Sequence, residues 1–352
     1  MEKPRLHHFD VVKGFAIFLV VIGHVITFCI RDIDRDPLFK FIGLVHMPMF
    51  FFISGYFSYR DNFASPKIIN RFRQLMIPGI IMLLLWKLYF PHSGIQSPLD
   101  FSWQGTFVNE YKNGYWFPYV LFAIIIIYSA IAPLLRAIKT ATIRLTVIAA
   151  LCAMFTVGAT LVTPTVDAAL SLTLIAQFFI PFMAGVISRH HSAMFNKAIA
   201  TPAVYTGALL VAATSMFFLA YRWDYPFMEP FQPLLMPLFH LTLPIVAMTI
   251  AKQWCDNNFT PQATSRWGNI WKLLGRESLA IYLIHYFFLF PLPHLQEPLR
   301  SVALDIVPTL IVTVPIAAII VAVSLMVNHI IARSPLLAQL LTGQLNPVKP
   351  KQ

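Results

Sequence analysis

The stretch FDVVKGFAIFLVVIGH, residues 9–24, places three ionisable side chains in a segment that is otherwise apolar enough to span a membrane. They are Asp10, Lys13 and His24. Lys13 and His24 are eleven residues apart, about three helical turns, so a helix puts them on one face roughly 16 Å apart along its axis, with Asp10 one turn earlier. An ionisable group in a lipid-embedded helix costs about 2.5–3.5 kcal/mol unless it faces protein or a wet cavity. The shared polar face therefore predicts a polar cavity within the membrane.

The composition of the whole chain excludes an ordinary soluble domain. Of 352 residues, 58% are hydrophobic and 12% are charged, and the mean hydropathy is +0.69, whereas about a quarter of the residues in soluble domains are charged. With about 20 apolar residues per helix, the sequence predicts an all-α, polytopic integral membrane protein of about ten transmembrane helices. Their centres are expected near residues 20, 49, 82, 126, 154, 178, 211, 241, 283 and 319. The first apolar run is too long for a secretory signal and lacks a small-x-small cleavage site, which predicts a retained helix.

The distribution of basic residues predicts the orientation. With the N-terminus inside, 18 Lys and Arg residues, among them Arg60, Lys67 and Arg71, fall in cytoplasmic segments and 7 on the opposite side, which favours both termini in the cytoplasm. We expect one membrane-embedded domain over residues 1–335 and a cytoplasmic C-terminal tail over 336–352. Because the basic residues are divided among short loops rather than gathered on one face, the formal charge of +11 does not indicate a nucleic-acid partner.

Cysteine and histidine spacing predicts neither a disulfide nor a metal site. The three cysteines, at positions 29, 152 and 255, are expected at different depths. The adjacent histidine pairs at 7–8 and 190–191 lack a Cys or carboxylate at ligand spacing. We therefore predict no metal cofactor.

Several motifs in chain order resemble those of a known family. The Phe9-Asp10-x-x-Lys13-Gly14 pattern with His24 is followed by HMPMFFFISGY at 46–56, RFR at 71–73 before Pro78, YWFP at 115–118 and GRESLAIYLIH at 275–285. Together they resemble the acyltransferase-3 family of integral membrane acyltransferases, and are most similar to its fucose 4-O-acetylase-like branch. The family usually has Arg where this chain has Lys13, which keeps the charge but loses the bidentate guanidinium fork.

The resemblance implies a membrane O-acyltransferase, usually an O-acetyltransferase. Such an enzyme moves an acyl group from cytoplasmic acetyl-CoA to a hydroxyl of an envelope sugar, polysaccharide or lipid-linked glycan. It also implies a multi-pass location in the bacterial cytoplasmic (inner) membrane. Donor and acceptor then lie on opposite faces, and the 16 Å between Lys13 and His24 suits an extended thioester arm that bridges this depth.

His24 is the first candidate for the chemistry. A sugar hydroxyl needs a base, and histidine, with an ordinary pKa of about 6.5, keeps a neutral proton-accepting form near neutral pH. His24 is expected either to deprotonate the acceptor or to carry the acyl group covalently. The alternative is a neutral histidine that only joins helices. Asp10, Lys13 and His285 complete the catalytic candidates. The alternative for Lys13 and Asp10 is an ion pair at the helix end.

The remaining candidates divide between the two substrates. Arg71, Arg73, Arg276 and Lys13 are predicted to bind the phosphates of acetyl-CoA, since cationic side chains, and guanidinium groups in particular, suit phosphates. Arg71 and Arg73 also fit the topology rule. Ser278, Tyr282 and His285 share one helical stripe at a depth like that of His24. His46 and Ser54 are expected on the second span. Both the stripe and this pair are candidates to bind the acceptor, and the alternative for each is a hydrogen bond that only joins helices.

Aromatic residues in two expected outer loops suit sugar stacking. Trp116 ends the loop at about 91–115, and a shorter loop carries residues 222–225 with Glu229. An aromatic belt at the membrane interface is the alternative.

Two other functional classes remain open from the sequence. A transporter of a small polar solute or acyl-modified substrate would use the same intramembrane charges. An assembly partner of a polysaccharide export complex would leave Lys13 and His24 without a task.

Overall fold

The computed structural model describes residues 6–30, 37–64, 67–95, 102–221, 231–260, 263–292, 294–295 and 306–344. These residues are almost entirely helical, apart from the two-residue antiparallel strands β1 (Phe259–Thr260) and β2 (Ala263–Thr264). The all-α prediction is confirmed. The acceptor-loop residues 222–225 and Glu229 lie outside the described part of the chain.

Nine helices of the described residues are long and apolar enough to cross a membrane, which confirms a polytopic protein. They are His7–Ile30, Leu38–Ser58, Ile68–His92, Trp116–Ala137, Ala141–Thr160, Leu172–His190, Pro202–Ala220, Leu234–Asn258 and Ile306–Ile331. Each contains one of the predicted centres. The tenth, near residue 283, is instead the short apolar helix Ser278–Phe288, because the chain breaks at Glu277 and reaches prolines at 291 and 293. The orientation of the termini stays a prediction.

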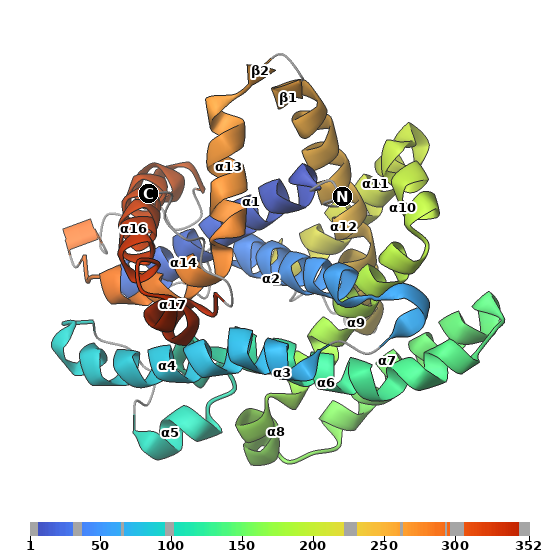
Figure 1. Cartoon of the computed structure of the whole chain (residues 1–352), viewed down its shortest axis with the longest axis horizontal. Coiled ribbons are helices and arrows are strands. Elements are labelled where there is room, and N and C mark those ends of the chain that lie inside the picture. Colours follow the sequence, from blue (N-terminus) through green and yellow to red (C-terminus); the bar gives the residue numbers. More distant parts are fainter. Residues whose placement is uncertain are drawn as a thin grey trace. The chain divides into compact units, whose positions relative to one another are not determined.

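The contacts divide the chain into two compact units, residues 1–53 with 191–325 and residues 54–190 with 326–352. In unit 1, α1 packs along both α12 and α13 (Figure 1). Its elements are α1 (His7–Val25), the π-helical turn η1 (Ile26–Ile30), α2 (Pro37–Ser58, through Ile53), α10 (Ser192–Ala200), α11 (Pro202–Tyr221), α12 (Gln232–Asn258), α13 (Arg266–Arg276), α14 (Ser278–Ile284), the 3-10 turn η7 (His285–Phe288) and α16 (Ile306–Ile331, through Leu325).

Glycine sets the distance between α1 and α13. A Cβ atom on Gly275 would collide with the backbone oxygen of Asp10, and one on Gly14 with the backbone oxygen of Trp271. Two helices approach this closely only where side chains are absent at the crossing point. The crossing fixes the N-terminal half of α1, which carries Asp10 and Lys13.

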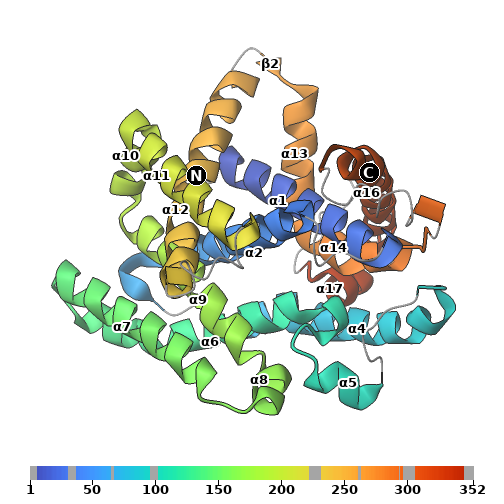
Figure 2. The ribbon, with the colours of Figure 1, turned by 180° about the vertical axis from the view of Figure 1, so that it is seen from behind.

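Unit 2 contains the remaining described elements. They are η2 (Asp61–Phe63), α3 (Ile68–Arg71), η3 (Phe72–Met76), α4 (Ile77–Tyr89), η4 (Phe90–His92), α5 (Trp103–Val108), η5 (Lys112–Gly114), α6 (Trp116–Ala137), α7 (Ala141–Thr160), α8 (Pro164–Leu170), α9 (Leu172–His190) and α17 (Pro335–Thr342). Within this unit, α17 packs against α4 (Figures 1 and 2). Part of the expected tail is therefore a packed helix, and the domain boundary at residue 335 stays a prediction.

The loop expected at about 91–115 is held by a buried lysine. Lys112 Nζ donates hydrogen bonds of 2.8–2.9 Å to three backbone carbonyls, those of Phe107, Ala168 and Ala169. Burial lowers the pKa of this ammonium group, whereas the nearby Glu110 raises it. The three carbonyls compensate much of the cost of burying the charge. Residues 96–101 of the loop lie outside the described chain.

Candidate active site

Asp10 and Lys13 form an ion pair at the start of α1. Lys13 Nζ lies 3.1 Å from Asp10 Oδ1, and the exposed fractions of the two side chains are 23% and 7%. The ion pair that the sequence predicts as the alternative role of these two residues is thus present. The pair lies where Gly275 contacts the Asp10 backbone, so α13 restrains it. The Asp10 carboxylate can thus keep the charged ammonium group of Lys13 at a fixed depth in the membrane.

His24, His285 and Tyr286 form a hydrogen-bonded cluster within unit 1. The His24 Nδ1 atom lies 2.7 Å from His285 Nε2, and the two imidazole planes are within 7° of parallel. The hydroxyl of Tyr286 lies 3.1 Å from His24 Nε2. His285 and Tyr286 are fully buried, whereas His24 is partly exposed. The predicted similarity in depth of His24 and His285 is confirmed.

The partners of the cluster assign its proton positions. His285 Nδ1 lies 2.9 Å from the carbonyl oxygen of Ile281, which only accepts, so this nitrogen carries a hydrogen. Its Nε2 then accepts from His24 Nδ1–H. The Nε2 atom of His24 is left as the acceptor for the Tyr286 hydroxyl. A proton taken up at His24 Nε2 would make the His24 ring positively charged. His285 Nε2, which accepts from His24 Nδ1–H, would stabilise that charge, as an orienting carboxylate does in other catalytic sites.

Local backbone features position the three side chains. α14 ends at Ile284 and tightens into the 3-10 turn η7, which brings consecutive residues 285 and 286 to the two nitrogens of one imidazole. After Val25 the first span widens into the π-helical turn η1, a feature often found at functional sites. The Leu292 N–H donates to the carbonyl of Cys29 at 2.9 Å, so the chain after η7 is tied to this turn.

Three further predicted residues lie in the same unit. The Nδ1–H group of His46 donates to the carbonyl of Ile42, and the side chain of Ile42 lies close to Gly23, one residue before His24. The ring of Tyr282 lies 6.1 Å from that of His285 and is 5% exposed. Ser278 begins α14, seven residues before His285, and no bond joins it to the cluster among those described. The structure therefore gathers His46 and Tyr282 around the two histidines.

The predicted phosphate ligands do not behave alike. Arg71 lines a polar pocket of about 240 Å³ in unit 2, where its Nη1 atom donates to Gln74 Oε1 at 3.2 Å. Arg60 and Lys67 line the same pocket. Arg73 is exposed and does not line it. Three cations around one small pocket suit a phosphate-bearing ligand.

Among the described contacts, three of the remaining predicted residues join neither the histidine cluster nor the polar pocket around Arg71. Arg276 is exposed at the end of α13 in unit 1. In unit 2, Ser54 is partly exposed on α2, and the indole of Trp116 stacks on Phe178 with ring centroids 5.4 Å apart. The Trp116 contact is an intramolecular packing contact, and binding of an acceptor there stays a prediction.

Sequence reasoning missed Tyr286, Arg60 and Lys67. Tyr286 directly follows the predicted His285, and only the 3-10 turn reveals that both side chains reach His24. Arg60 and Lys67 are predicted from the sequence only to lie on the cytoplasmic side, with no role in binding. Their proximity to the RFR motif in the sequence was the available signal.

Comparison with known proteins identifies the family. Residues 6–329 match the acyltransferase-3 family model, described as an acyltransferase domain. The chain belongs to the acyltransferase-3 family. The predicted membership is thereby confirmed, and the fucose 4-O-acetylase-like branch stays a prediction.

Two curated relatives, both named nodulation protein NolL, are similar to part of this acyltransferase-3 chain. The protein from Sinorhizobium fredii is 36% identical over 129 residues, which are 33% of this chain and 33% of the relative. The protein from Mesorhizobium japonicum is 34% identical over 128 residues, 32% of each chain. The match thus spans about one third of the length of either relative. No solved structure matches the chain.

Proposed function

We propose that this protein is a membrane O-acetyltransferase of the bacterial inner membrane. It transfers an acetyl group from cytoplasmic acetyl-CoA to a hydroxyl of an envelope sugar or glycan. The single observation that carries the proposal is the His24–His285 pair, which leaves Nε2 of the partly exposed His24 as an acceptor that the Tyr286 hydroxyl occupies. The family match supports the reaction class.

The cluster supports general base catalysis at His24 Nε2. The acceptor hydroxyl replaces the Tyr286 hydroxyl at this nitrogen and gives up its proton as its oxygen attacks the thioester carbonyl carbon. The carbon–sulfur bond then breaks, and the leaving thiolate takes the proton back from the His24 imidazolium. His285 holds His24 in the required tautomer throughout. Covalent transfer through His24 is the other route that this atom permits.

The pocket lined by Arg60, Lys67 and Arg71 is proposed to bind the phosphates of acetyl-CoA. These side chains supply up to three positive charges and a guanidinium fork, which suits phosphate oxygens. The predicted cytoplasmic location of all three residues agrees with a cytoplasmic donor.

A transfer assay with the full chain tests the function. Purified protein in lipid nanodiscs is given acetyl-CoA labelled in the acetyl group together with envelope glycans from cells that lack the gene. Mass spectrometry is expected to find an acetyl increment on a sugar hydroxyl. Absence of any labelled glycan, with properly folded protein and intact acetyl-CoA, would refute the proposal.

Replacing Arg71 by Gln is expected to raise the KM for acetyl-CoA about 10- to 100-fold with little change in kcat. Loss of one charge-assisted hydrogen bond to phosphate costs about 1.5–3 kcal/mol, and such uniform binding appears in KM. Lys197→Gln, an exposed change on α10, is the matched control. An unchanged KM in the Arg71 variant would remove this pocket from the donor site.

Replacing Tyr286 by Phe is expected to lower the KM for the acceptor between twofold and tenfold. The substrate hydroxyl no longer has to displace the tyrosine hydroxyl from His24 Nε2, and one neutral hydrogen bond is worth about 0.5–1.5 kcal/mol. Initial rates at varied acceptor concentration measure the effect, with Tyr205→Phe on α11 as the control. A raised KM would show that the Tyr286 hydroxyl helps to bind the acceptor instead.

A further inference from the structure

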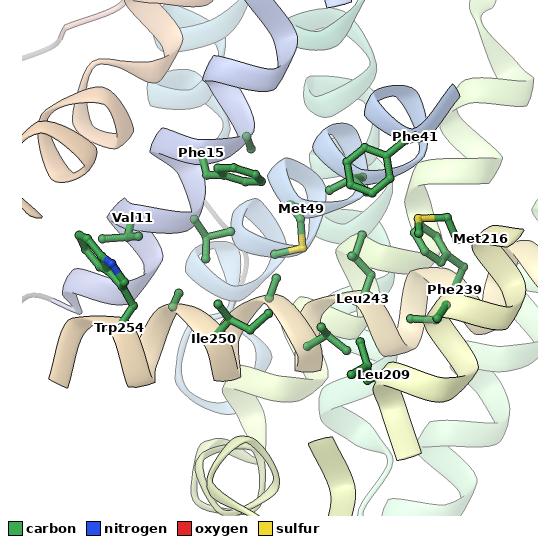
Figure 3. A pocket seen from close by; sticks show the side chains of 18 of the residues that line it. Val11, Phe15, Phe41, Met49, Leu209, Met216, Phe239, Leu243, Ile250 and Trp254 are labelled. Atoms are coloured by element: carbon green, nitrogen blue, oxygen red, sulfur yellow. The ribbon is translucent and has the colours of Figure 1, made fainter. Parts of the chain in front are cut away.

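Unit 1 contains an elongated apolar cavity of about 480 Å³ that the proposed chemistry does not use (Figure 3). Its walls come from α1, α2, α11, α12 and α13, and every residue that lines it is apolar. Alanines on two facing helices create much of the space. They are Ala212 and Ala213 on α11 and Ala247 and Ala251 on α12. We call this cavity the alanine groove.

The alanine groove is long and narrow. On α12 its lining begins at Phe239 and ends at Trp254, a distance of about 22 Å at 1.5 Å per residue. Val11 and Trp254 lie together at one end, whereas Phe41, Met216 and Phe239 lie at the other (Figure 3). The shape suits a linear chain rather than a compact ligand.

The lining suits a hydrocarbon. Apart from the indole N–H groups of Trp254 and Trp271, the lining side chains carry no N–H or O–H group for water or for a polar arm such as that of CoA. An unpaired polar group costs about 2–7 kcal/mol. The rim is open sideways, because Phe15, Leu209 and Ile250 are 48%, 39% and 51% exposed on helices that are long enough to span a membrane. A chain can therefore enter from the bilayer. The length of about 22 Å along α12 accommodates one extended hydrocarbon chain.

One end of the groove lies beside the histidine cluster. Phe41 and Val45 of α2 line the groove, and His46 directly follows Val45 in the chain. Ile42 lies close to Gly23, one residue before His24. Lys40 is in the first turn of α2, at this same end. A cation and a helix N-terminus both favour a negatively charged phosphate.

We propose that the alanine groove binds the hydrocarbon chain of a lipid-linked sugar acceptor, whose phosphate lies near Lys40 and whose sugar hydroxyl reaches His24. The assignment rests on the proposed acetyltransferase function and names the acceptor class of that site. The groove holds the lipid by apolar contact, and the proton and acetyl transfers are those at His24 Nε2.

Photolabelling tests the occupant directly. The full chain in phosphatidylcholine nanodiscs is irradiated with a photoreactive isoprenoid phosphate, and labelled peptides are mapped by mass spectrometry. Labels are expected on the groove-facing parts of α11 and α12, and unlabelled isoprenoid phosphate is expected to reduce them at least tenfold. Equal competition by phosphatidylcholine would assign the groove to bulk lipid, and competition by palmitoyl-CoA alone would assign it to the donor. Either result overturns the inference.

A groove-filling variant tests the link to catalysis. Ala247→Phe is expected to raise the KM for a lipid-linked sugar at least tenfold and to leave transfer to the same sugar as a water-soluble glycoside unchanged. Ala213→Phe provides a second filling change. Leu210→Phe, on the exposed side of α11 outside the groove, is the control. An unchanged KM in both filled variants refutes the groove assignment alone. Photolabelling without acetyl transfer to either acceptor by the wild-type chain refutes the proposed function alone.

Discussion

Replacing His24 by Ala is expected to slow acetyl transfer about 10²- to 10⁴-fold while the protein accumulates in the membrane at its normal level. General base catalysis contributes a factor of this size. In the structure the partly exposed His24 is the member of the cluster that a substrate can approach, because His285 and Tyr286 are fully buried. The Nε2 atom of His285 accepts from His24, whereas the Nε2 atom of His24 accepts from the Tyr286 hydroxyl, which the acceptor hydroxyl can replace.

The measurement is the initial rate with labelled acetyl-CoA, divided by the amount of folded protein. His329→Ala, which removes an exposed histidine near the end of α16, is the matched control and should keep the wild-type rate. His285→Ala is expected to lower kcat about 10²-fold with little change in either KM, because loss of orientation in a catalytic group has an effect of this size. A His24→Ala rate within a few fold of wild type would exclude His24 as the base and as an acyl carrier.

Helix periodicity made the most secure part of the site predictable. The rise of 1.5 Å per residue predicts similar depths for His24 and His285, and the two side chains are in contact in the structure. The hydropathy of the sequence predicts the nine spans that the described residues contain. It failed near residue 283 because a window average does not register that a helix breaks at Glu277 and continues in a tighter 3-10 turn.

Features that depend on tertiary packing were not predictable. Tyr286 is one of 12 tyrosines in a chain with 31 phenylalanines, so an aromatic side chain carries little local signal. Arg60 and Lys67 obey the topology rule whether or not they line a pocket. The alanine groove was hidden for a related reason. Apolar residues on a membrane helix have the same sequence pattern whether they face lipid, a packed neighbour or a cavity.

Replacing Gly275 by Ala is expected to lower the thermal midpoint of the detergent-solubilised protein by several degrees and to abolish most of its activity. The new Cβ would overlap the backbone oxygen of Asp10, and no side-chain rotation can relieve a clash with backbone. Overpacking typically costs about 1–3 kcal/mol, and here α1 and α13 must separate. This displacement affects the Asp10–Lys13 pair on one helix and α14, which begins three residues after position 275, on the other.

Gly158→Ala is the matched control for the Gly275 change, since it makes the same substitution in α7 at a position where nothing lies within 4 Å of the new Cβ. Alanine is favoured over glycine inside a helix by about 0.8–1 kcal/mol, so this variant should be as stable as wild type or slightly more so. Thermal midpoints from fluorescence-detected size exclusion compare the two. The opposite result would be a gain in stability for Gly275→Ala like that of Gly158→Ala. Helix propensity would then outweigh the clash with the Asp10 backbone, and the close crossing of α1 and α13 would not be what fixes the N-terminal half of α1.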